Sequence, residues 1–122
     1  ILQTAIDLRE EQNTNLSSKT LKKALAYIDE HYTSENLSLG TVACEVQVGA
    51  NYLSSVFSQN MQKTFTEYIS EKRMEKAKKL LKSTELPTSE IAAQVGYKDP
   101  HYFSFVFKKT QGCSPREYRS SI

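Results

Sequence analysis

Residues 90–119 read EIAAQVGYKDPHYFSFVFKKTQGCSPREYR, and this stretch decides the fold that the sequence predicts. Its first apolar side chains have the spacing of one face of a short helix, and they are Ile91, Ala92 and Val95. A second helix is predicted to start at Pro100, because proline suits the first helical position and Asp99 before it is a favourable N-cap. The predicted order is a short helix, a tight turn and a second helix, which is the arrangement of a helix-turn-helix motif.

The same pattern stands about 50 residues earlier, so the chain contains an internal repeat. The matching pairs are VACEV at 42–46 with IAAQV at 91–95, Tyr52-Leu53-x-x-Val56-Phe57 with Tyr102-Phe103-x-x-Val106-Phe107, and the capping boxes Thr64-x-x-Glu67 with Ser114-x-x-Glu117. Ser38 is expected to cap the short helix of the first unit. We therefore expect an all-α fold, with two tandem helix-turn-helix units joined by a long linker helix.

The rest of the chain completes this plan of two units. An amphipathic helix that carries Leu21, Ala24, Leu25, Ile28 and Tyr32 is expected to pack on the first unit. The predicted boundaries are 1–17 for a linker or the end of a missing N-terminal domain, 18–69 for the first unit, 65–82 for the linker helix and 83–122 for the second unit. Because the first residue is Ile1 and not Met, we expect a piece of a longer protein without its sensing or effector domain.

Charge is distributed unevenly along the chain, although the net charge is only +2. Residues 1–36 carry four Lys or Arg and six Asp or Glu, whereas residues 37–122 carry twelve and eight. The basic surplus therefore lies where the two predicted motifs lie, and it favours a polyanionic partner.

Composition and spacing argue against several other classes. No apolar run approaches the ~20 residues of a membrane span, so we expect no membrane partner and a cytoplasmic protein. Cys44 and Cys113 have no second thiol or histidine at ligand spacing, which predicts reduced thiols, no metal site and no cofactor; Cys44 is expected to be buried. An enzyme is not expected, since His31 and His101 stand in unrelated contexts and no Gly-rich phosphate loop is present.

The stretch 90–119 closely resembles the signature of AraC/XylS-type transcription regulators, and RMEKAKKLL at 73–81 resembles the linker helix of that family. The resemblance covers about residues 20–120. It implies seven helices, with two recognition helices that enter successive major-groove segments of double-stranded DNA. The segments KALAYIDEHY and LSL, after a linker that begins LRE, resemble response regulators of the YesN type, whose N-terminal receiver domain would be missing here.

The resemblance also implies which side chains face DNA. The first recognition helix is expected at about 50–60 and the second at about 100–109. The predicted base contacts are Asn51, Ser54, Ser55, Ser58, Pro100, His101, Ser104 and Phe105. Ser55 and Phe105 stand where the family often has arginine, so guanine readout is not expected there. For Phe105 two alternatives stay open, packing against the linker helix and contact with a thymine methyl group.

Residues beside the recognition helices are expected to contact phosphates. They are Lys63, Thr64, Lys98, Lys108, Lys109 and Ser114. Lysines at these places release counterions from DNA when they bind, and a helix start offers backbone N–H groups to a phosphate. The alternative for each polar side chain on these helices is an ordinary solvated face. Because the lysines flank the second motif in particular, we expect that motif to supply more of the electrostatic attraction.

One departure from the family concerns the turn after the first recognition helix, where Gln62 stands in place of the usual glycine. The second unit has Gly112 there. We therefore expect a strained or different turn at Gln62.

We predict sequence-specific DNA binding for transcription regulation, as the output domain of a response regulator. Two alternatives remain, the output domain of a ligand-sensing regulator and a helical protein-interaction module without DNA binding. Besides DNA, RNA polymerase is an expected partner. The fragment is expected to be a monomer, and the full-length protein a dimer.

Overall fold

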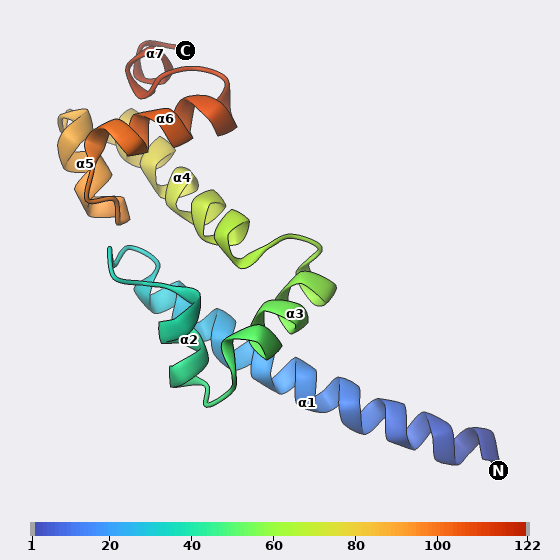
Figure 1. Ribbon diagram of the computed structural model, residues 1–122. Helices are drawn as coiled ribbons and strands as arrows, with labels where there is room; N and C mark the ends of the chain where they lie inside the picture. The colour runs from blue at the N-terminus through green and yellow to red at the C-terminus, as the bar shows by residue number, and fades with distance from the viewer. Residues whose placement is uncertain (1, 122) are drawn as a thin grey trace. The chain divides into compact units, whose positions relative to one another are not determined.

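The structure, a computed structural model, describes the backbone of residues 2–121 and the side chains of residues 17–121. The described residues form seven helices and no strand, which confirms the predicted all-α fold. In chain order they are α1 (Leu2–His31), α2 (Leu39–Glu45), α3 (Ala50–Met61), α4 (Phe65–Ser83), α5 (Thr88–Val95), α6 (Pro100–Gln111) and α7 (Pro115–Ser120) (Figure 1).

The contacts between residues divide the chain into two compact units. Unit 1 is Ile1–Asp29 with Ser38–Phe65, and unit 2 is Glu30–Leu37 with Thr66–Ile122. These contacts group nearly all of α4, the predicted linker helix, with the second helix-turn-helix motif. The helical backbone of α1 begins at Leu2 and so includes the predicted linker. Whether residues 1–17 belong to a missing domain stays a prediction.

Unit 1 is built on the apolar faces of α1, α2 and α3. Its buried hydrophobic residues are Ala24, Ile28, Val42, Ala43, Leu53, Val56, Phe57 and Phe65. Ser38 begins α2 with a capping box, because its hydroxyl accepts from the Thr41 N–H while the Thr41 hydroxyl accepts from the Ser38 N–H. The rings of Phe57 and Phe65 meet edge to face at a centroid distance of 5.9 Å. The predicted amphipathic helix thus contributes Ala24 and Ile28 to this core.

Unit 2 has a larger core, which α5, α6 and α7 form around the C-terminal turns of α4 (Figure 1). Its buried residues are Met74, Ala77, Leu81, Ile91, Ala92, Val95, Tyr97, Phe103, Val106 and Phe107, with Leu80, Leu86 and Tyr118 packed against them. Full burial of a large apolar side chain contributes about 1.5–3 kcal/mol, so the three α6 residues of this core fix which face of α6 points outward.

Capping residues in unit 2 start the helices where the sequence predicts. The Asp99 carboxylate accepts from the His101 N–H at 2.9 Å, and Pro100 occupies the first helical position of α6. Ser114 begins α7 with a capping box, in which its hydroxyl accepts from the Glu117 N–H at 3.1 Å. A cap of this kind contributes roughly 1 kcal/mol, so the start of each helix is set locally.

The two units differ in the residues that hold left-handed backbone. In the turn after the short helix, Gln47 has φ 62° and Gly96 has φ 108°. After the recognition helix, Gln62 has φ 57° and Gly112 has φ 83°. A residue with a Cβ is strained by about 1–2 kcal/mol in this region, whereas glycine is not. Of the two predicted possibilities for Gln62, the structure has the left-handed turn, in which strain is expected, and Gln47 is a second such position in unit 1.

Candidate nucleic-acid interface

From their second residues onward, α3 and α6 present the same sequence of buried and exposed positions. In α3 the buried stripe is Leu53, Val56 and Phe57, and in α6 it is Phe103, Val106 and Phe107. Because the stripes have the same helical phase, each predicted base contact has a counterpart in the other helix. Asn51, Ser55 and Ser58 are exposed on α3, as are His101, Phe105 and Lys108 on α6, while Ser54, Ser104 and Pro100 are half-buried.

The outer face of α3 is polar and uncharged. Among its exposed side chains, Asn51 can both donate and accept hydrogen bonds, and Ser55 and Ser58 have the same capacity in a shorter side chain. Tyr52 adds a ring that is 41% exposed. The helix begins after Gly49, which makes no side-chain cap bond. These groups can form hydrogen bonds to base edges or to phosphate oxygens.

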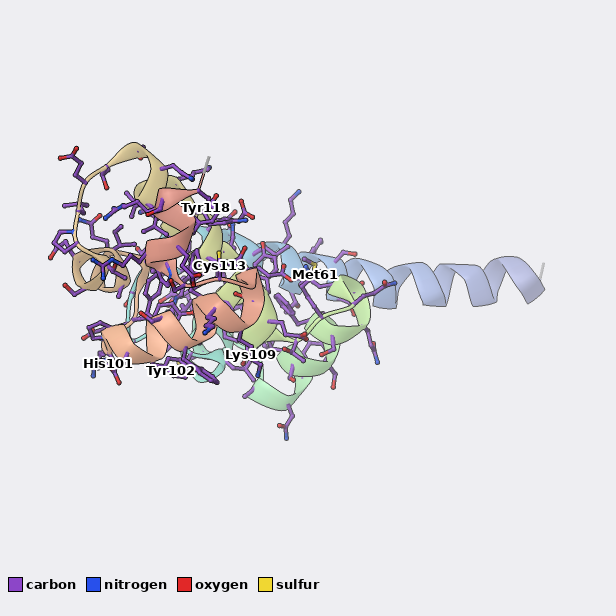
Figure 2. The ribbon with its side chains drawn as sticks, turned by 90° about the horizontal axis from the view of Figure 1, so that it is seen from above. Met61, His101, Tyr102, Lys109, Cys113 and Tyr118 are labelled. Atoms are coloured by element: carbon purple, nitrogen blue, oxygen red, sulfur yellow. The ribbon has the colours of Figure 1, made fainter. Side chains whose placement is uncertain are left out.

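The outer face of α6 is aromatic at its start and basic at its end. Tyr102 is 55% exposed and Phe105 is 61% exposed, and their rings stack at a centroid distance of 6.4 Å with an interplanar angle of 30°. Figure 2 shows His101 and Tyr102 near one end of α6 and Lys109 toward the other. Tyr102 was missed in the sequence, although its place three residues before Phe105 on a helix could have indicated the contact.

A shallow groove of about 380 Å³ lies beside this face, between α4 and α6. Phe105 and Tyr102 line it from α6, and Glu67 and Glu71 are among the residues that line it from α4. Of the two alternatives for Phe105, packing against α4 is therefore partial, because most of the ring surface stays accessible.

Arg73 contacts Tyr97, the buried ring that packs against Tyr102. Its side chain is 9% exposed, and it donates from Nε to the Tyr32 carbonyl at 2.7 Å and from Nη2 to the Ser34 carbonyl at 2.9 Å. The guanidinium also lies over the Tyr97 ring, 5.0 Å from its centroid. Tyr97 in turn contacts Tyr102 at 5.9 Å and Phe103 at 5.6 Å between centroids. Buried contacts thus reach from α4 to the exposed ring of Tyr102.

The predicted phosphate contacts lie on the surface at the ends of the helices. Lys98, Lys108, Lys109 and Thr64 are exposed, and Lys63 and Ser114 are half-buried. At Ser114 the backbone N–H already donates to the Glu117 carboxylate at 3.0 Å, and the next residue, Pro115, has no N–H. The Ser114 backbone N–H is therefore already engaged within the capping box, and Pro115 adds no donor beside it. DNA contact by these six residues stays a prediction.

The titration of Glu117 is clearly shifted. The hydrogen bond from the Ser114 backbone N–H, and then the one with the Ser114 side chain, hold the pKa of Glu117 below its ordinary value of 4.5. Hydrogen bonds to a carboxylate favour the charged form, so the capping box is kept at neutral pH.

Cys44 corrects one prediction, because it is exposed and not buried. Its neighbour Ala43 takes the buried position on α2, so the next residue along the helix points outward. Cys113 is half-buried, and neither thiol is in a disulfide.

Among the side chains of residues 17–121, no three metal-binding side chains lie close enough together to hold an ion. None of the described helices is both long and apolar enough to span a membrane.

Comparison with known proteins decides the family. A sequence profile described as a helix-turn-helix domain matches residues 42–121. The C-terminal domain of the two-component response regulator yesN from Fusobacterium nucleatum is 38% identical, with a TM-score of 0.81 over 84% of this chain and 99% of that one. The chain belongs to the AraC-type family of helix-turn-helix DNA-binding domains.

Two further members of the family are similar to this AraC-type domain. The C-terminal domain of AraT, a response regulator from Geobacillus stearothermophilus, is 44% identical with a TM-score of 0.80, covering 82% of this chain and 83% of that one. The arabinose operon regulatory protein of Escherichia coli is 34% identical over 100 residues, which are 82% of this chain and 34% of that protein. The chain spans 34%, 40% and 36% of the length of three curated relatives that it matches.

Proposed function

We propose that this AraC-type domain is the DNA-binding output domain of a response regulator, with α3 and α6 reading successive major-groove segments of double-stranded DNA. One observation carries the proposal. Both helices bury the same stripe and leave the same positions exposed, at the place where a helix-turn-helix motif carries its recognition helix. An α-helix fits the major groove, where each base pair shows a distinct pattern of donors and acceptors.

Base readout is assigned to the exposed faces of both helices. On α3 the Asn51 amide can pair with adenine through two hydrogen bonds, and Ser54, Ser55 and Ser58 can reach base edges or phosphates. On α6 the contacts are Pro100, His101, Ser104 and Phe105, at the start and middle of the helix. His101 follows the Asp99 cap directly, so its ring stands at the end of the helix that enters the groove first.

Phosphate contacts are assigned to Lys63, Thr64, Lys98, Lys108, Lys109 and Ser114. Lys98, Lys108 and Lys109 belong to unit 2 and are exposed, which supports a stronger electrostatic contribution from that unit. Each phosphate that a lysine neutralises releases counterions, so affinity should fall steeply as salt rises.

The response-regulator assignment rests on two relatives whose matched segments are the C-terminal domains of response regulators. A second candidate is the output domain of a ligand-sensing regulator, which the similarity to an arabinose operon regulatory protein supports. The two differ in the domain that precedes this one. Cytoplasmic location, contact with RNA polymerase and dimerisation of the full-length protein are also part of the proposal.

Selection from a pool of random duplexes, followed by fluorescence anisotropy at several salt concentrations, tests DNA binding. Two half-sites about one helical turn apart are expected in the selected sequences. We expect affinity for the selected duplex to exceed that for random duplex by at least about 10³-fold. Absence of binding at low salt, or binding that does not depend on salt, would contradict the proposal and favour a protein-interaction module.

A further inference from the structure

We propose that Tyr102 and Phe105 act together as an aromatic pair that selects the 5-methyl group of pyrimidines, so that the α6 half-site is chosen by thymine or 5-methylcytosine. This inference rests on the proposed function, because it assumes that α6 enters the major groove. It goes further by assigning α6 a kind of readout that α3 does not share.

The pair presents apolar surface where a recognition helix meets the bases. Tyr102 and Phe105 are one helical turn apart, and both remain more than half exposed. Exposed aromatic rings on this scale are unusual unless a partner covers them, because their burial is favourable. At the position of Phe105, α3 has Ser55, which offers a hydroxyl and little apolar surface.

The Tyr102 ring is held in place by buried neighbours, so it can make a rigid contact with a base. Its ring packs against Tyr97, which is 8% exposed and lies under the guanidinium of Arg73. Arg73 is itself fixed by two hydrogen bonds to backbone carbonyls. A side chain that is ordered before binding loses less entropy on binding, so the pair can discriminate between bases that differ by one methyl group.

The charges around the pair favour DNA as its occupant. Lys108 and Lys109 follow on the same helix and are exposed, so the apolar surface continues into a basic one. Carboxylates line the groove only from the α4 side, where Glu67 and Glu71 would repel a phosphate. DNA is therefore expected to lie over α6 itself, with the rings against the bases, and not to enter the groove between α4 and α6.

The chemistry of the major groove completes the assignment. Of the four standard bases, only thymine carries a methyl group there, at C5, and this group is recognised by apolar contact. Phe105 has no hydrogen-bonding group, so the methyl group is what its ring can distinguish. Burial of one methyl group corresponds to about a fourfold change in affinity.

The test replaces thymidine by deoxyuridine, one position at a time, in the duplex selected by the wild-type protein. This change removes only the methyl group. We expect a loss of about fourfold at one or two neighbouring positions of one half-site. With Phe105→Ser, which copies the residue of α3, the loss at those same positions should disappear. Restoring a methyl group there by 5-methylcytosine in a duplex with a C·G pair should raise the affinity of the wild-type protein over that for unmethylated cytosine.

Matched variants separate this effect from others. Tyr102→Phe keeps the ring and should keep the methyl dependence, whereas Tyr52→Ala on α3 should leave the sensitive positions unchanged. Phe105 is 61% exposed and packs only partly against α4, so Phe105→Ser should melt close to the wild-type temperature. If Phe105→Ser melts at a clearly lower temperature, Phe105→Leu is used in its place, and it should retain only part of the methyl dependence.

The outcomes distinguish this inference from the proposed function. If the wild-type protein selects no duplex, the proposed function fails. Two results with a selected duplex would show that the aromatic pair does not read methyl groups. Deoxyuridine would leave the affinity of the wild-type protein unchanged, or it would lower the affinity of Phe105→Ser by the same factor as that of the wild type. Unchanged DNA binding by Phe105→Ser at every position would point to a protein partner for this surface and would also overturn the inference.

Discussion

The α2–α3 pair of unit 1 and the α5–α6 pair of unit 2 bury matching apolar side chains, except that Val46 is half-buried and its counterpart Val95 is fully buried. The two pairs differ more at their turns and on their outer faces. Unit 1 has glutamine at both left-handed positions, and unit 2 has glycine at both. On the recognition helices, Ser55, Ser58 and Gln59 correspond to Phe105, Lys108 and Lys109. A repeated core therefore fixes the geometry of both motifs, while the strain and the recognition chemistry of each have diverged.

The largest expected effect comes from the glycine that is both left-handed and tightly packed. Gly96→Ala places a Cβ 2.9 Å from Nε of Arg73 and keeps φ at 108°. Strain and the displaced guanidinium should together lower the free energy of unfolding by about 2–4 kcal/mol. Urea unfolding followed by circular dichroism measures this loss.

Gly112→Ala is the control, because φ is 83° there and no atom lies within 4 Å of the added Cβ. It should cost about 1–2 kcal/mol, from backbone strain alone. Equal losses for the two variants would show that the contact with Arg73 does not constrain unit 2.

Base contacts give the next effect, on DNA affinity. Asn51→Ala in unit 1 and His101→Ala in unit 2 should each lose about 1–3 kcal/mol on the selected duplex and much less on random duplex. Fluorescence anisotropy with both duplexes measures the difference. If a variant loses the same affinity on both duplexes, the replaced side chain contacts phosphates and not bases. If a variant loses no affinity, the replaced side chain does not lie in the interface.

Relief of strain in unit 1 gives a smaller effect of opposite sign. Gln62→Gly should raise the free energy of unfolding by about 1 kcal/mol, because φ at this position is 57°. Gln59→Gly, within the preceding helix α3, should lower it by about 1 kcal/mol, since glycine is a poor helix former. If both variants are destabilised to the same extent, the left-handed turn at Gln62 carries no strain.

The smallest effect concerns the capping box of α7. Ser114→Ala removes the side-chain hydrogen bond that helps to lower the pKa of Glu117, so this pKa should rise toward 4.5. Since the pKa is lowered in the folded protein, the stabilisation from Glu117 is present above the unfolded pKa and is lost as pH falls through the folded pKa. An NMR titration of the Glu117 carboxyl measures its pKa in the wild type and in Ser114→Ala. An unchanged pKa in the variant would exclude the Ser114 hydroxyl as a cause.

The sequence predicted those features that depend on neighbours in the chain. The caps at Ser38, Asp99 and Ser114 follow from residue types within three positions, and the buried stripes follow from helical spacing. Strain at Gln62 followed from comparison with Gly112, which the repeat made possible.

Features that depend on distant residues were not predicted. Arg73 binds carbonyls of residues 39 and 41 positions away in the chain, and no local pattern indicates such a partner. The stacking of Tyr102 on Phe105 depends on side-chain orientation as well as spacing. Cys44 was wrongly placed because residue type favours burial for cysteine, whereas the helical phase of α2 gives the buried position to Ala43.

The salt dependence of DNA binding tests most directly whether two motifs with one core contribute unequally. The logarithm of the association constant for the selected duplex is measured against the logarithm of salt concentration for the wild type, for Lys108→Gln/Lys109→Gln and for Ser58→Ala/Gln59→Ala. We predict that the slope of the lysine variant is shallower by about 1.8, or 0.9 for each lost phosphate contact, and that the slope of the α3 variant equals that of the wild type. Equal slopes for the wild type and the lysine variant would contradict the account.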